Sequence, residues 1–158
     1  MRLTVLLTVL VLVFVRPPVL AHDPAEHGSD HASAAGVPGD PNAPTRTIEI
    51  AMREGDGKML FAPNTIDVTV GEQVRFKLVN EGELEHEFVL GTPQEITEHA
   101  EMMQAMPDMK HSDPNAARLQ PKATSDIVWK FTSAGAFEFA CLIPGHREVG
   151  MVGRVIVK

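Results

Sequence analysis

The chain has 158 residues, 44% of them hydrophobic and 22% charged, so it is long enough for one domain with a buried core. Its formal net charge is −7, and an acidic protein lacks the basic surface that binding to nucleic-acid phosphates requires. A single cysteine excludes an internal disulfide, and in an oxidising compartment a lone cysteine is a liability unless it is buried or bound to a metal.

Residues 1–21 are typical of a secretory signal peptide. A short basic start, Met1-Arg2, precedes the apolar run from Leu3 to Val15. The small residue Ala21, at the end of Val19-Leu20-Ala21, predicts cleavage after position 21. An uncleaved membrane anchor is the alternative, but the run is short for a span of about 20 residues, and Arg16-Pro17-Pro18 interrupts it. We therefore expect a periplasmic protein with no stable membrane insertion after cleavage.

Residues 22–45 show no hydrophobic period and are rich in Ala, Pro, Gly, Asp and His, which predicts a disordered leader. The leader carries three scattered histidines, His22, His27 and His31. Two interpretations remain open, a solvated tether and a weak collector of Cu(II) or Zn(II).

From Thr47 onward, apolar and polar residues alternate in short segments separated by turns, which indicates strands with one buried face. We expect the segments 66–70 and 74–78 to form a hairpin around Gly71-Glu72. About seven or eight such strands with one helical insert predict an all-β sandwich over residues 46–158. The expected strands are 47–52, 59–62, 66–70, 74–78, 86–90, 127–131, 137–141 and 152–157.

The alternation stops in the insert, residues 92–121. Thr92, Pro93 and Glu95 have the order of a capped helix start, which predicts a helix over 93–106, followed by a loop over 109–121. Methionines dominate one face of this helix, at the spacing i, i+3, i+4 and i+7. The face is either a patch of soft ligands for Cu(I), an apolar face that packs on the sandwich, or a docking surface for an electron-transfer partner. The residues concerned are His99, Met102, Met103 and Met106, with Met109 and His111 following.

One loop near the C-terminus gathers metal-binding side chains. Cys141 is followed by His146 and then by Met151, each five residues further on. A thiolate, two imidazoles and a weak axial thioether are the ligands of a type 1 (blue) copper site, so one more histidine is needed. His86, at the start of a strand in the middle of the domain, is the best candidate. The alternative is a buried free cysteine, a core methionine and two incidental histidines.

Strand parity supports the copper interpretation. Phe137, Phe139 and Cys141 lie on one face of their predicted strand, so the thiol ends a row that faces the core. Such a position keeps water away from the sulfur, and solvent access would promote its oxidation.

These residues make the chain resemble the cupredoxins, the plastocyanin/azurin family, over about Thr47 to Lys158. The Cys-x4-His-x4-Met spacing is similar to that of auracyanin and rusticyanin, and the His-bearing leader and Met-rich insert resemble the periplasmic CopI-like copper-tolerance cupredoxins. The resemblance implies a Greek-key β-sandwich and a type 1 copper held by His86, Cys141, His146 and Met151. Glu87 departs from the asparagine that many members have after the first histidine. The matching residues are Phe61-Ala62-Pro63, Ile66-x-Val68-x-Val70-Gly71, Val74-x-Phe76, His86 and the Cys141 to Met151 loop.

The sequence thus predicts a Cu(I)/Cu(II) protein, not an enzyme, that serves copper tolerance, electron transfer or both. Its partners would be a redox protein or a copper-handling protein. The alternatives are a dedicated respiratory electron shuttle and a copper enzyme with an additional catalytic copper site. The extra soft ligands of the insert and leader favour copper handling over a pure shuttle, and additional weakly bound copper would follow from them.

Overall fold

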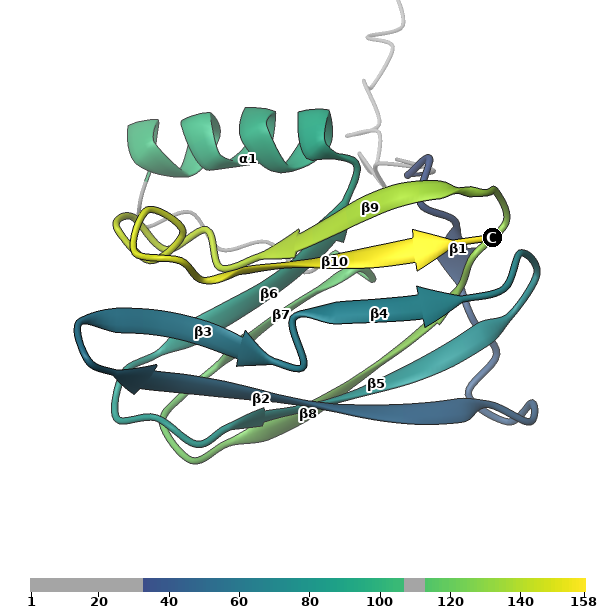
Figure 1. Ribbon diagram of the computed structural model, residues 1–158, viewed down its shortest axis with the longest axis horizontal. Helices are drawn as coiled ribbons and strands as arrows, with labels where there is room; N and C mark the ends of the chain where they lie inside the picture. Colours follow the sequence, from purple (N-terminus) through teal and green to yellow (C-terminus); the bar gives the residue numbers. More distant parts are fainter. Residues whose placement is uncertain (1–32, 107–112) are drawn as a thin grey trace, which may run out of the picture. The chain divides into compact units, whose positions relative to one another are not determined.

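The computed structural model describes residues 33–106 and 113–158, in which two five-stranded sheets pack face to face (Figure 1). The first sheet has the order β1-β8-β5-β2-β3 and the second the order β4-β10-β9-β6-β7. The first consists of β1 (Val37–Pro38), β8 (Thr124–Lys130), β5 (Gln73–Asn80), β2 (Arg46–Gly55) and β3 (Lys58–Ala62). The second consists of β4 (Thr65–Val68), β10 (Val152–Val157), β9 (Gly135–Ala140), β6 (His86–Gly91) and β7 (Ala116–Leu119). The predicted β-sandwich is confirmed, with β1 and β7 in addition to the expected strands.

Alternating apolar residues of both sheets meet between the layers and form the core, as period-two strands dictate. Phe139 of β9 lies at its centre, with its ring centroid 5.1 Å from that of Phe61 and 5.2 Å from that of Phe88. Phe137, Phe139 and Cys141 all belong to this core. The predicted inward-facing row that ends at the thiol is therefore confirmed.

The predicted hairpin over 66–78 is wrong, because β4 and β5 belong to different sheets. β4 pairs in parallel with β10, whereas β5 lies between β2 and β8. The turn between them crosses from one layer to the other, and Gly71, with φ at 84°, donates its N–H to Phe131 O at 2.7 Å. Alternation shows that each strand has one buried face, but it does not show which sheet the strand joins.

The disorder predicted for residues 22–45 is wrong for the described part, 33–45. β1 pairs with the edge of β8, and Ala35 is fully buried. The indole Nε1 of Trp129 donates to Ala35 O at 3.2 Å. Most of the apolar surface buried at this contact belongs to the large side chain of Trp129, so a residue as small as Ala35 fits beside it. The segment is therefore ordered although its own sequence has low hydrophobicity. The rest of the predicted leader and the predicted signal peptide lie outside the described residues.

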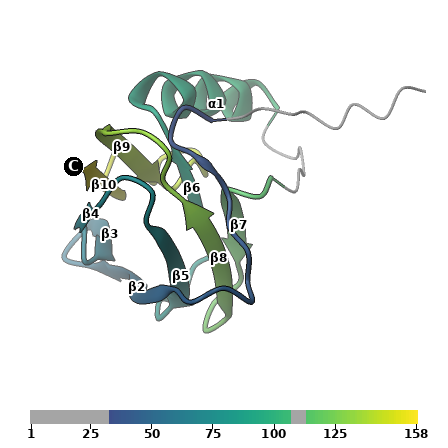
Figure 2. The ribbon, with the colours of Figure 1, turned by 90° about the vertical axis from the view of Figure 1, so that its right-hand side faces the viewer.

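The helical insert forms as predicted, with α1 spanning Pro93–Ala105. Thr92 Oγ1 accepts from Glu95 N at 3.1 Å, and Glu95 Oε2 accepts from Thr92 N at 2.6 Å, so the predicted capping box is present. Figure 2 shows α1 on the outer side of the second sheet, and its buried residues Ile96 and Met103 pack against that sheet. Among the described residues, no helix is both long and apolar enough to cross a membrane. β7, which lies within the expected loop, pairs with β6.

Candidate metal centre

Three of the predicted ligands meet at one end of the sandwich. Possible donor atoms of His86, Cys141 and His146 all lie within 4.8 Å of one another. His146 Nδ1 lies 3.2 Å from His86 Nδ1 and 3.3 Å from Cys141 Sγ. His86 and Cys141 are fully buried, whereas His146 is partly exposed. The structure therefore brings together one sulfur and two imidazole nitrogens from segments that are 60 positions apart in the sequence.

His86 is the first residue of β6, as expected, and its ring is held at both nitrogens. Its Nδ1 faces His146, while its Nε2 lies 2.6 Å from Glu54 Oε1. Burial works against the charge of this carboxylate, but hydrogen bonds from the Glu83 and Leu84 N–H groups and from His86 outweigh it and lower the pKa of Glu54 below its ordinary 4.5. Sequence reasoning missed Glu54. It stands 32 positions before the histidine, and no local pattern marks it as part of the site.

Cys141 follows the last residue of β9 and is enclosed on every side. Glu87 N–H donates to its Sγ at 3.3 Å, and its own N–H donates to Met151 O at 3.1 Å. Burial raises the pKa of the Cys141 thiol from 9.0 to about 12. The thiol is therefore protonated in the metal-free protein at neutral pH, and binding of a metal to the sulfur must release that proton.

The loop that carries His146 is built from tight turns. Gly145 and Gly150 have φ values of 92° and 109°, a left-handed conformation that glycine adopts without strain. His146 N–H donates to Ile143 O, and Met151 N–H donates to His146 O. Burial, followed by the neighbouring His86, lowers the pKa of His146 below its ordinary 6.5. The imidazole is thus neutral at pH 7, the form that binds metals.

Met151 closes the loop and is fully buried in the same core cluster as Cys141. Glu87 is only 5% exposed and lies opposite Arg118 in the β6–β7 pair. Its backbone N–H, and not its side chain, makes the bond to the cysteine sulfur. Any residue other than proline supplies that donor, so a glutamate at this position provides the contact as well as an asparagine would.

The predicted methionine face of α1 is split between two environments. Met103 is 1% exposed and packs with Ile96 and Leu142, which confirms the core interpretation for this residue. Met102 and Met106 are 40% and 43% exposed. His99 is partly buried on the same helix. Met109, His111 and the three leader histidines lie outside the described residues.

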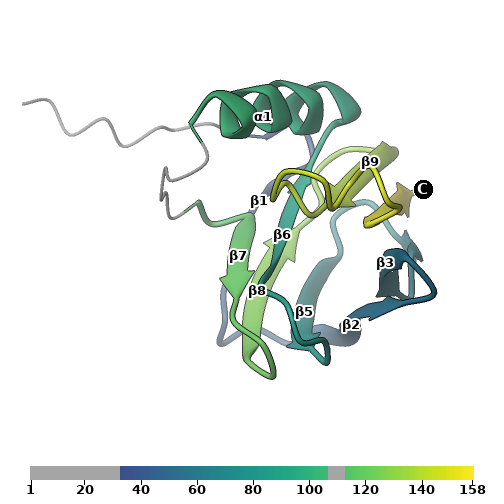
Figure 3. The ribbon, with the colours of Figure 1, turned by 90° about the vertical axis from the view of Figure 1, so that its left-hand side faces the viewer.

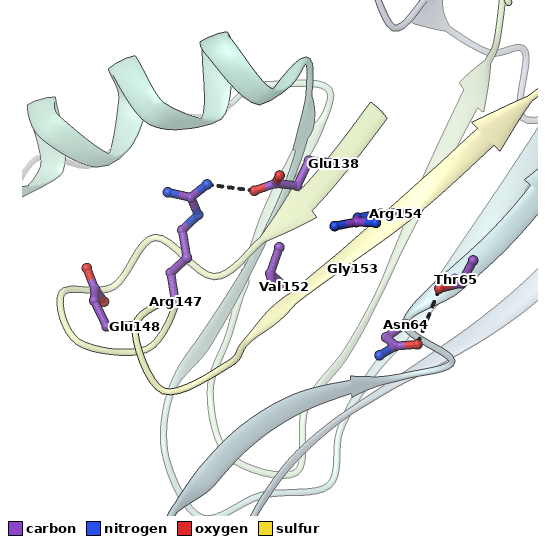
Figure 4. Close-up of a pocket in the computed structure, with 8 residues that line it drawn as sticks. All are labelled: Asn64, Thr65, Glu138, Arg147, Glu148, Val152, Gly153 and Arg154. Atoms are coloured by element: carbon purple, nitrogen blue, oxygen red, sulfur yellow. Dashed lines mark hydrogen bonds and ion pairs between the residues drawn. The ribbon is translucent and has the colours of Figure 1, made fainter. Parts of the chain in front are cut away.

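A polar cavity beside the ligand loop is separate from the three donor atoms (Figure 4). Arg147, the neighbour of His146, points across it toward Glu138 of β9, and the two groups form an ion pair at 2.8 Å. Two arginines and two glutamates line the cavity, so it has no strong excess of either charge. Its clearest role is to fasten the ligand loop to β9.

The donor set fits copper. Thiolate and imidazole together suit Cu(I) and Cu(II), and a trigonal two-His, one-Cys arrangement with a weak methionine is the geometry of a type 1 site. The sulfur and the His86 ring are fully buried and the His146 ring is partly buried, so the centre is largely closed to water.

Comparisons with known proteins agree with this assignment. The family described as copper binding proteins of the plastocyanin/azurin family matches residues 48–158. The copper-resistant cuproprotein CopI of Rubrivivax gelatinosus is 51% identical over 141 residues, covering 84% of each chain. CopI of Pseudomonas aeruginosa is 36% identical, covering 85% of this chain and 88% of the relative. Among solved structures, auracyanin B has a TM-score of 0.63 at 22% identity, covering 80% of this chain and 96% of auracyanin, and it shares the cupredoxin fold.

Proposed function

The chain belongs to the plastocyanin/azurin family of copper-binding proteins, and from this premise we propose that it is a periplasmic type 1 copper protein that cycles between Cu(I) and Cu(II) in copper tolerance. His86, Cys141, His146 and Met151 are the ligands in this proposal. Copper bound here would supply a one-electron couple. The single observation that carries the proposal is the convergence of two imidazole nitrogens on a buried thiol.

Each ligand has a distinct part in the proposed site. Cys141 supplies a strong, soft donor in a place from which solvent is excluded, and His86 supplies a buried imidazole. His146 is the partly exposed ligand, so in the proposal it connects the buried centre with the surface. Met151 is fully buried, and its carbonyl oxygen accepts from Cys141 N–H at 3.1 Å. In the proposal it is the weak axial thioether, a type of ligand that favours Cu(I).

Copper tolerance is favoured over a dedicated electron shuttle by the two relatives named copper-resistant cuproproteins. The predicted signal peptide supports export to the periplasm. A role without catalysis is part of the proposal, in which the cluster of His86, Cys141 and His146 found among residues 33–106 and 113–158 serves as the copper site. The partner in this proposal is a copper-handling or redox protein.

Visible spectroscopy tests the copper site directly. We expect purified protein to develop an intense thiolate-to-copper charge-transfer band on addition of one equivalent of Cu(II). C141S should abolish that band, and M102L, which alters an exposed methionine outside the proposed site, should retain it. Absence of the band in the folded wild-type protein, or its survival in C141S, would refute the type 1 assignment.

A growth experiment tests the physiological part of the proposal. Deletion of the gene should lower the copper concentration that arrests growth, and the wild-type gene should restore it, whereas C141S should not. Normal growth of the deletion strain on copper, together with a defect in respiration, would instead support the electron shuttle.

The exposed methionines extend the proposal to a second, weaker Cu(I) site. Met102 lies in the last turn of α1, and Met106, the C-cap residue, donates its N–H to Met102 O, so the two exposed residues are about one helical turn apart. In competition with a Cu(I) chelator, we expect more than one bound ion, and M102L/M106L should lose only the weaker one. C141S should lose the tighter one. An unchanged stoichiometry in M102L/M106L would remove this extension and leave the type 1 site intact.

A further inference from the structure

Glu54, near the end of β2, places its carboxylate against the loop that precedes the proposed ligand His86. Its Oε2 accepts from Glu83 N at 3.0 Å, and its Oε1 accepts from Leu84 N at 3.0 Å. The same Oε1 lies 2.6 Å from His86 Nε2. One side chain therefore contacts three residues of the segment 83–86, Glu83, Leu84 and the proposed ligand His86.

The loop is shaped to receive this carboxylate. Both Glu54 oxygens occupy the space that a Cβ at Gly82 would need, so only glycine allows the approach. On the buried side, Asn80 Nδ2 donates to Leu84 O at 2.8 Å, and Asn80 Oδ1 accepts from Gly82 N at 2.9 Å. The loop is thus held between a buried amide and a carboxylate, and the carboxylate alone reaches the imidazole.

The backbone around Glu54 is itself fixed. Glu81 N–H donates to Met52 O at 3.0 Å, and Arg53 pairs with Glu81 at 2.5 Å, which ties β2 to the start of the loop. The Glu54 side chain is 23% exposed, whereas that of His86 is fully buried. The contact is therefore a partly shielded hydrogen bond on well-anchored backbone, unlike the exposed ion pairs elsewhere on this sheet.

This geometry has a definite consequence for the imidazole. A carboxylate that accepts two backbone N–H groups offers only acceptor lone pairs, so the close contact requires the proton on His86 Nε2. The other nitrogen, Nδ1, then faces Cys141 and His146 with its lone pair. A carboxylate behind a ligand imidazole also makes that imidazole a more basic donor, which stabilises the more highly charged metal ion.

Resting on the copper site proposed above, we propose that Glu54 is a positioning residue that fixes the Nε2–H tautomer of His86, aims Nδ1 at the metal and favours Cu(II) over Cu(I). This effect on the metal is separate from the way in which Glu54 holds the loop 83–84 through its backbone N–H groups. The backbone contacts to Glu83 and Leu84 hold the loop whichever oxidation state is bound, whereas the bond to His86 acts differently on the two states.

The tautomer is measured on the metal-free protein, so this arm does not depend on copper binding. Long-range nitrogen–proton correlation spectra at pH 8 distinguish protonated from unprotonated ring nitrogens, and H86Q identifies the signals of His86. We expect the proton on Nε2 in the wild-type protein. Absence of a proton from Nε2 would overturn the proposal even if the protein binds copper normally.

The second arm compares the copper affinities of E54Q and E49Q. Glutamine keeps the length of the side chain but removes the negative charge that favours Cu(II). Glu49 lies on the same strand, pairs with Lys77 at 3.0 Å and is 57% exposed. E49Q therefore removes the same charge from β2 without touching the site, and it controls for the net charge of the protein.

We expect E54Q to lose about 10- to 100-fold in Cu(II) affinity, the range for such supporting groups, with a much smaller loss for Cu(I). Each tenfold selective loss raises the reduction potential by about 59 mV for one electron. E49Q should leave the potential unchanged.

Equal losses of Cu(I) and Cu(II) affinity in E54Q, with no change in potential, would show that Glu54 only holds the loop before His86. That result would overturn the proposal. If E54Q does not fold, the tautomer of the wild-type protein still decides. A failure of the wild-type protein to bind copper would refute the proposed function and leave the tautomer result standing.

Discussion

The buried thiol of Cys141 gives the sharpest test of the structure, because its chemistry should differ strongly between folded and unfolded protein. Thiol reagents attack the thiolate, so the labelling rate follows the ionised fraction and access to the sulfur. The pKa of Cys141 is raised from 9.0 to about 12 by burial, and the residue is fully buried. At pH 8, ionisation alone should therefore slow labelling of the metal-free protein by about a thousandfold relative to the unfolded chain.

The assay is stopped-flow labelling of metal-free protein with an aromatic disulfide, between pH 7 and 11, in buffer and in denaturant. In denaturant the rate should level off as pH passes about 9, the ordinary value for the thiol. In buffer it should continue to rise beyond pH 10. A plateau near pH 9 in buffer, or a rate within tenfold of the unfolded chain at pH 8, would refute the described environment of the sulfur.

The same shift predicts how stability depends on pH. Since the folded-state pKa of Cys141 lies above the unfolded value, the folded protein holds this proton more tightly, and the stabilisation is complete below pH 9 and is lost as pH rises toward 12. C141A, which has no such group, supplies the reference. The stability difference between the wild-type protein and C141A should fall between pH 9 and 12 in urea titrations, and a constant difference would contradict the raised pKa.

Three further changes test the surroundings of the site by urea unfolding. G153A should lower the free energy of unfolding by at least about 2 kcal/mol, because the ring of Phe139 fills the place of the new methyl group and Asn64 O lies 2.9 Å from it. The control G55A, with open space around it, should lower it by less than about 1 kcal/mol. N80A should also cost at least about 2 kcal/mol, because it leaves three backbone carbonyls and one N–H without their amide partner. Burial disfavours the ionised form of Glu95, but its hydrogen bonds lower its pKa below 4.5, so the stability difference between the wild-type protein and E95Q should be full above pH 4.5 and disappear at lower pH.

The features that could be predicted from the sequence depend on residues close together in the chain. Period-two alternation places Phe139 and Cys141 on one buried face, and the short loop from Cys141 to Met151 keeps three of the proposed ligands adjacent. The capping box of α1 is likewise local, with Thr92 and Glu95 three positions apart. His86 could be predicted because it stands at the start of a strand in an otherwise regular pattern.

The features that could not be predicted depend on which strands become neighbours. Glu54 reaches His86 only because parallel pairing of β2 with β5 places Met52 opposite Asn80, at the start of the loop before the histidine. The turn at Gly71, which crosses from one sheet to the other, and the burial of Ala35 against Trp129 also depend on which strands become neighbours. Each is a contact between distant segments, which hydrophobic period alone does not determine.

The β2–β3 hairpin links the two halves of the site. Glu54 and Met59 face each other across its strands. Glu54 contacts His86, while Met59 N–H donates to Val149 O at 3.5 Å in the loop that carries the other proposed ligands. Figure 3 shows this hairpin and the ligand loop at the same end of the sandwich, with α1 on the other side of the loop.

The ligand loop is therefore held from three directions, by the core beneath Cys141, by α1 through Leu142 and by the hairpin at Val149. Its own hydrogen bonds are short-range turns, which fix its shape but not its distance from His86. External contacts must supply that distance, and a distance fixed by three packed elements changes little when the charge at the centre changes by one. With copper bound as proposed, such a centre would keep the rearrangement between Cu(I) and Cu(II) small, which is what fast one-electron cycling requires.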